Sequence, residues 1–135
     1  MYNTLCYDLR SDGKIVLCVA SSGIAALLFK GGCTVHLHFK VPIPIHESSF
    51  CNIPKTSQLA DLIRLANLVI WDKAPMQHRH IIKAVDHSFR DLCDSDKPFS
   101  ALTVVFGGDF QQILPVILKG SRAQVVGACM QRSIL

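Results

Sequence analysis

Three uninterrupted apolar runs divide the chain, and segments with helical spacing lie between them. The runs cover residues 14–20, 67–72 and 101–108 and are rich in β-branched residues, as buried strands are. None alternates between apolar and polar positions, so we expect a parallel sheet with helices on both faces, the layout of an α/β domain. The side chains predicted to be buried in this sheet are Ile15, Val16, Leu17, Val19, Leu68, Val69, Ile70, Val104 and Val105.

The segments between the runs predict helices. Residues 21–29 are expected to be helical directly after the first run, with Ser21 or Ser22 as the N-cap. Residues 57–66 carry apolar side chains at helical spacing, and residues 75–93 predict a longer helix with a proline in its first turn. The apolar face predicted for this longer helix consists of Ile81, Ile82, Val85, Phe89 and Leu92.

Residues 31–55 predict a long loop with room for one short element, because they combine a Gly-Gly pair, prolines and polar clusters. Polar residues also follow each predicted strand. Ligands of parallel sheets lie beyond the carboxyl ends of the strands, so these residues predict one nucleotide-binding crevice. The alternative is that strand ends are polar in any protein. The strand-end pairs are Ser21 and Ser22, Asp72 and Lys73, and Gly108 and Asp109.

The composition fits one intracellular domain. Half of the 135 residues are hydrophobic and 18% are charged, which allows a buried core, and the net charge of +4 favours an anionic partner such as nucleic acid. The six cysteines are at least twelve residues apart, so there is no C-x-x-C pair, and we expect reduced thiols. The chain start lacks a secretory pattern, and no apolar run is long enough for a membrane span, so we expect no membrane contact.

Three segments together resemble one family. "VLCVASSGIAALLFKGGCTVHLHFKVPI", "LVIWDKAPM" and "VVFGGDFQQILPVI" are similar to the first RecA-type domain of the PIF family of superfamily 1 DNA helicases, nearest to the plant group related to rolling-circle transposon helicases. The likeness runs from about residue 4 to the C-terminus. It implies a three-layer RecA-like P-loop NTPase fold with a mainly parallel sheet. It also implies ATP-driven 5′-to-3′ unwinding of DNA, a nuclear or other intracellular location, and roles in repair, recombination and telomere maintenance.

The resemblance also implies roles for individual residues at the ATP site. Asp72 matches the family's Mg²⁺-associated aspartate, a hard oxygen ligand near the phosphates; the alternative is an aspartate that caps the following helix. Gln112 matches the glutamine that senses the γ-phosphate, and an amide can do this without adding charge. Gly107 and Gly108 match the tight backbone turn at this strand end. The expected cofactors are Mg²⁺ and ATP.

The stretches "SSGIAA" and "GGCTVHLHF" match the family segment that touches single-stranded DNA. Ser22, Thr34 and His36 would supply donors to phosphates, and Phe39 would offer an apolar or stacking surface. Lys40 adjoins this segment and is the lysine expected to face DNA. A zinc site is not expected, because neither Cys33, His36 and His38 nor His78 and His80 give four ligands at a usual spacing.

The sequence departs from the family at functional positions. Lys73 stands where the family has the catalytic glutamate, Leu37 stands where it has a serine, and Gln111 replaces a common arginine. A lysine is protonated at neutral pH and cannot accept a proton from water. The 135 residues also contain no match to the phosphate-loop pattern G-x-x-x-x-G-K-[ST].

These departures leave several hypotheses open. In the first, residues 1–135 are a partial RecA-like helicase ATPase domain, truncated before the phosphate loop, without a second RecA-like domain and inactive alone. In the second, the chain is a catalytically dead module that binds nucleic acid or a full-length helicase. In the third, it is a gene-model fragment.

Overall fold

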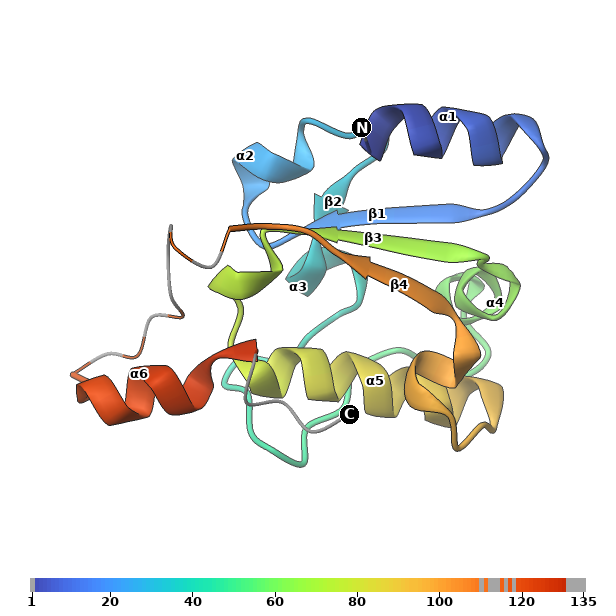
Figure 1. The fold of residues 1–135 in the computed structure, drawn as a ribbon. Coiled ribbons are helices and arrows are strands. Elements are labelled where there is room, and N and C mark those ends of the chain that lie inside the picture. Colours follow the sequence, from blue (N-terminus) through green and yellow to red (C-terminus); the bar gives the residue numbers. More distant parts are fainter. Residues whose placement is uncertain (1, 110, 112–114, 116, 118, 131–135) are drawn as a thin grey trace.

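The computed structural model describes residues 2–109, 111, 115, 117 and 119–130. Its strands are β1 (Val16–Ala20), β2 (Cys33–Thr34), β3 (Leu68–Asp72) and β4 (Thr103–Phe106). They form one parallel sheet in the order β2-β1-β3-β4 (Figure 1). The parallel α/β sheet predicted from the three apolar runs is therefore confirmed, and β2 is a fourth strand inside the predicted loop.

Helices cover both faces of the sheet (Figure 1). On one face lie α1 (Tyr2–Ser11) and α2 (Gly23–Ala26); on the other lie α3 (Val35–His38), α4 (Gln58–Leu65) and α5 (Arg79–Cys93). The strand side chains alternate between two cores. Val16, Cys18, Leu68 and Ile70 pack with Cys6 of α1, and Leu17, Val19, Val69 and Trp71 pack with the apolar side of α5.

Most of the predicted core is confirmed. The five apolar side chains of the predicted face of α5 are buried, as are all the predicted positions in β1 and β3. Ile15, Val104 and Val105 are only half-buried. Ile15 precedes β1, and β4 is the edge strand of the described sheet, so one of its sides has no neighbouring strand to cover it.

Two predicted helices have different bounds. The helix predicted at 21–29 is the single short helix α2, and its N-cap is Ser22, whose hydroxyl accepts from the N–H of Ala25 at 3.3 Å. The predicted start at residue 75 is wrong, since Pro75 lies in a separate 3-10 turn, η1 (Ala74–Met76). The extended backbone of Gln77 then separates this turn from the next helix, so α5 begins at Arg79.

Helix α1 was not expected from the sequence. It is amphipathic, and its single buried residue, Cys6, is flanked by the half-buried Tyr2 and Leu9. The chain continues from β4 towards α6 (Arg122–Ala128), which lies beside the start of α5 (Figure 1). No helix within the described ranges is long and apolar enough to cross a membrane.

A buried carboxylate fixes the connection between α5 and β4. Asp86 is 1% exposed, accepts from the N–H of Phe99 at 2.6 Å and pairs with Arg90 at 2.9 Å. Phe99 begins a run of three residues with left-handed backbone in η2 (Pro98–Ala101), a conformation that costs free energy in residues other than glycine. The ion pair and the backbone bond therefore hold a strained turn in place.

Candidate nucleotide and DNA site

The ends of the three longer strands meet at one edge of the sheet. The N–H of Ser21, after β1, donates to the carbonyl of Asp72 at 3.1 Å. The N–H of Gly107, after β4, donates to the carbonyl of Trp71 at 2.8 Å, and the Gly107 carbonyl accepts from Ala74 at 2.9 Å. Backbone hydrogen bonds thus bring together the strand-end residues expected to line one crevice.

Asp72 and Lys73 lie at the centre of this edge. Asp72 ends β3 and is half-buried, and Lys73 adopts a left-handed backbone (φ 56°, ψ 31°) that turns the chain into η1. Asp72 therefore precedes a 3-10 turn and does not cap α5, whose N-cap is His78.

Gly108 packs closely against this turn. A Cβ atom at Gly108 would lie 2.6 Å from Cδ of Pro75 and 3.2 Å from Cα of Lys73, and the φ of Gly108 is +140°. Both observations require glycine here, since a side chain would be strained and would collide with the turn. The expected tight turn at Gly108 is thus explained by contact with the Lys73–Pro75 segment.

Tyr2 is a residue of this edge that the sequence did not reveal. A Cβ atom at Gly107 would collide with the Tyr2 hydroxyl group, so the start of α1 abuts the end of β4. The Tyr2 ring also packs near the Phe29 ring, with centroids 6.1 Å apart. The amphipathic pattern of α1 could have indicated the helix, but no sequence signal indicated its contact with Gly107.

Ser21 joins the strand ends to the turn before α5. Its hydroxyl accepts from Nε1 of Trp71 at 3.4 Å, and its carbonyl accepts from Nε2 of Gln77 at 3.3 Å. Gln77 is 5% exposed and was missed in the sequence, because a single glutamine after a proline turn carries no pattern. Ser21 therefore has a positioning role here.

Asp72 alone could hold a magnesium ion only together with the phosphates of a bound nucleotide, which would supply further oxygen ligands. Mg²⁺ is commonly held by one or two carboxylates together with waters and substrate phosphates. Asp72 is partly accessible at the sheet edge, whereas Asp109, after β4, accepts from the N–H of Gln111 at 2.8 Å. No group of three or more His, Cys, Asp or Glu residues in the described part could hold a metal. Gln112 lies outside the described residues.

The residues expected to touch DNA lie at the start of α2 and around α3: Ser22 precedes α2, Thr34 precedes α3, His36 is within α3, and Phe39 and Lys40 follow it. Thr34 caps α3, because its hydroxyl accepts from the N–H of Leu37 at 3.4 Å, and Lys40 is exposed. His36 is half-buried, and this burial lowers the pKa of its imidazole, so at neutral pH it is uncharged. Ser22 caps α2 in the same way as Thr34 caps α3.

The prediction that Phe39 offers a stacking surface to DNA is wrong. Phe39 is 0% exposed, and its ring packs edge-on against Phe89 of α5 with centroids 5.3 Å apart. Val35 and Phe39 are four residues apart on the same side of α3, so both enter the core below the sheet. The phenylalanine therefore anchors the end of α3 in the core and presents no ring face to a base.

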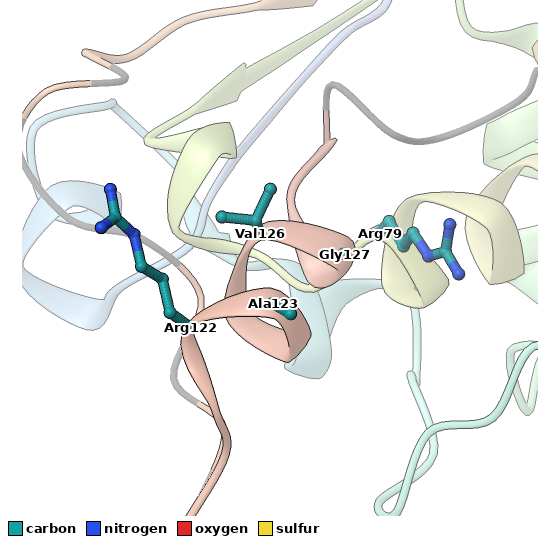
Figure 2. A pocket seen from close by; sticks show the side chains of 5 residues that line it. All are labelled: Arg79, Arg122, Ala123, Val126 and Gly127. Carbon is teal, nitrogen blue, oxygen red and sulfur yellow. The ribbon is translucent and has the colours of Figure 1, made fainter.

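A separate hollow of about 670 Å³ lies between α5 and α6 (Figure 2). Its lining includes Arg79 and Arg122, but Figure 2 shows these two side chains pointing away from each other. The arginines do not converge on one ligand position, so this hollow is not assigned to the candidate site.

The fold and this edge define the class of protein. A covered parallel sheet with a carboxylate, a glycine turn and serines at its carboxyl edge is an α/β domain with its candidate ligand crevice at that edge. The sequence model of the PIF1-like helicases matches residues 1–135. The chain belongs to the PIF1-like helicase family.

Similarity to individual proteins agrees with this assignment. The chain is 31% identical over 124 residues to an ATP-dependent DNA helicase Pif1 of Psychrobacter sp. (strain PRwf-1), covering 90% of this chain and 18% of that protein. It thus spans less than a fifth of that relative's length.

Solved structures share the fold. Bacteroides Pif1 bound to single-stranded DNA is 32% identical with a TM-score of 0.73, over 84% of this chain and 26% of that one. Bacteroides Pif1 in complex with ADP-AlF3 and single-stranded DNA is 28% identical with a TM-score of 0.79, over 95% and 31%. The described domain therefore has the RecA-like fold of Pif1 structures.

Proposed function

We propose that residues 1–135 are part of the first RecA-type domain of an ATP-dependent DNA helicase that translocates 5′-to-3′ on single-stranded DNA. The observation that carries this proposal is the meeting of Ser21, Asp72 and Gly107 at the carboxyl edge of the sheet, in a chain of the PIF1-like family. The crystal structures of Bacteroides Pif1 with single-stranded DNA and with ADP-AlF3 support the proposal that this chain's ligands are single-stranded DNA and an adenine nucleotide. The plant-type likeness and the roles in repair, recombination and telomere maintenance belong to the same proposal.

In this proposal Asp72 is the protein's ligand for Mg²⁺, and Gln112 contacts the γ-phosphate. When bound with ATP, Mg²⁺ would neutralise charge on the phosphates. The turn at Gly108 keeps the end of β4 close to Lys73, so a phosphate group would face backbone from two strand ends. This packing holds the two strand ends together without a side chain between them.

Lys73 determines what this site can catalyse. An ammonium group has no lone pair with which to take a proton from water, and by the family resemblance Lys73 stands where the family has its catalytic glutamate. Lys73 can attract phosphate oxygens through its charge, as lysines in nucleotide sites do. We therefore propose that the 135-residue polypeptide does not hydrolyse ATP by itself.

DNA contact in this proposal comes from Ser22, before α2, and from the segment around α3, residues 34–40. Ser22 and Thr34 accept backbone hydrogen bonds and retain their hydroxyl hydrogens for donation to phosphate oxygens. The exposed Lys40 adds a charge, and the imidazole of His36, whose pKa is lowered by burial, can donate through a ring N–H. The contact proposed here is with the DNA backbone, because Phe39 is in the core.

A second candidate function is a regulatory module that binds DNA or a full-length helicase without catalysis. Lys73 favours it, because a lysine in place of the family's glutamate removes the catalytic base, whereas the sheet and the segment around α3 are present. Both candidates predict DNA binding; only the helicase proposal predicts that a glutamate at position 73, together with a phosphate loop and a second RecA-type domain, gives DNA-stimulated hydrolysis.

The direct experiment on the shared step is fluorescence anisotropy with a labelled oligothymidine and the 135-residue protein. Weak binding that falls steeply as salt rises would support both candidates, because a few phosphate contacts release counterions. The absence of binding at low salt would contradict DNA contact by this domain.

A further inference from the structure

Two buried thiols face each other between α1 and β1. The sulfur atoms of Cys6 and Cys18 are 3.2 Å apart, and the two residues are 4% and 3% exposed. A disulfide bond is about 2.05 Å long, so a movement of roughly 1 Å would join them. Both cysteines are free thiols in this structure, and neither belongs to the candidate nucleotide site.

Arg10 holds the surroundings of this pair in place. Its guanidinium group donates to the carbonyl of Val16 at 3.0 Å and to the carbonyl of Lys30 at 3.2 Å, and it lies 3.7 Å from the sulfur of Cys18. The end of α1 is thus tied to β1 beside the thiols. This restraint favours reaction of the two sulfurs with each other over reaction with distant cysteines.

We propose that Cys6 and Cys18 form an oxidation-sensitive dithiol, which glutathione disulfide or a similar small disulfide converts into a bond that staples α1 to the sheet. One cysteine thiolate attacks a sulfur of glutathione disulfide and expels one glutathione thiolate. The second cysteine thiolate attacks the resulting mixed disulfide and expels the other. The protein loses two protons and two electrons, and glutathione disulfide is reduced to two glutathione molecules.

The same surroundings make this reaction slow. Burial, with the neighbouring Cys6, raises the pKa of the Cys18 thiol to about 12, and the thiolate is the reacting form. The small disulfide can reach the pair only when α1 lifts from the sheet. The oxidation rate should therefore rise with pH and with conditions that loosen α1.

The bond would act on the helix that reaches the candidate site. Tyr2, at the start of α1, abuts Gly107 at the end of β4, and Cys6 lies one turn further along the same helix. Oxidation therefore would restrict the movement of α1 against the strand end. Reduction would release it, as expected of a transient intracellular disulfide.

The test is to incubate the folded 135-residue protein with glutathione disulfide, block the remaining thiols and digest it with trypsin without reduction. Cleavage after Arg10, Lys14 and Lys30 yields peptides 1–10 and 15–30, which carry Cys6 and Cys18 as their only cysteines. Mass spectrometry should find these two peptides linked. The thermal midpoint should rise on the order of 10 °C and return after treatment with dithiothreitol.

Matched variants make the result specific. Cys6→Ser and Cys18→Ser should each lose the linked peptide and the rise in midpoint, whereas Cys93→Ser, at the end of α5, should keep both. If a variant fails to fold, the linked peptide and the thermal midpoint of the wild-type protein before and after oxidation still test the proposal. A linked peptide that forms only in denaturant, a different pairing, or an unchanged midpoint in the oxidised protein would overturn the proposal.

Discussion

The backbones of Lys73 and Gly108 pack against each other at the carboxyl edge of the sheet, since a Cβ atom at Gly108 would be 3.2 Å from Cα of Lys73. This contact connects the strand that carries Asp72 with the glycine turn after β4. The turn that follows Asp72 is therefore packed against the end of β4.

Gly108→Ala should destabilise the domain. The new methyl group would meet Cδ of Pro75 at 2.6 Å, and alanine would keep an unfavourable φ of +140°. We expect a loss of about 2–4 kcal/mol in the free energy of unfolding, measured by urea denaturation. Gly127→Ala is the control, because nothing lies within 4 Å of its added Cβ and alanine favours helix α6. Equal effects of the two variants would contradict the close contact at Gly108.

Asp86→Ala should unfold the connection between α5 and β4. It leaves Arg90 without its buried partner and removes the acceptor for the N–H of Phe99, so we expect a loss of about 3–5 kcal/mol. Asp91→Ala is the matched control, since Asp91 makes an exposed ion pair with Lys55 that is worth about 1 kcal/mol or less. Thermal denaturation of both variants measures the difference. Similar midpoints would show that the carboxylate of Asp86 does not hold the turn.

Stability should fall as the solution is acidified from about pH 7.5 to about pH 5.5. Burial lowers the pKa of His38, and the charge of Lys40 lowers it further. The unfolded chain therefore binds more protons than the folded chain below about pH 6.5, and stability is lost as pH falls through that value. His38→Gln should lose less of its thermal midpoint over this range. Parallel curves for the two proteins would show that His38 does not contribute.

DNA binding should depend on the segment around α3, residues 34–40. The combined change of Thr34, His36 and Lys40 to alanine should lower affinity for single-stranded DNA several-fold and reduce its salt dependence, because fewer phosphates are contacted. Lys14→Ala removes an equal charge before β1, at the opposite end of the sheet, and should bind like wild type. Circular dichroism checks folding, since Thr34 also caps α3. Undiminished binding by the triple variant would show that the segment around α3 does not contact DNA.

The sequence predicted the sheet well because uninterrupted apolar runs identify strands buried on both sides. The side of the short helix α3 that faces inward differs from the prediction. The family resemblance assigns "GGCTVHLHF" to DNA contact, whereas Val35 and Phe39, four residues apart, are both buried in the core. The contact of Tyr2 with Gly107 joins residues more than a hundred positions apart, and no local pattern encodes it. Pairings of this kind depend on the packing of the complete domain.

The most direct test of the account is Mg²⁺-dependent ATP hydrolysis by the 135-residue protein with and without single-stranded DNA. We expect a rate equal to that of the buffer alone, because Lys73 cannot accept a proton and the 135 residues contain no phosphate-loop pattern. Lys73→Glu should also remain inactive: a base contributes about a hundredfold to ten-thousandfold, but only to a substrate that is held in place. Mg²⁺-dependent turnover by the unmodified protein that disappears in Asp72→Ala would contradict this account of Lys73.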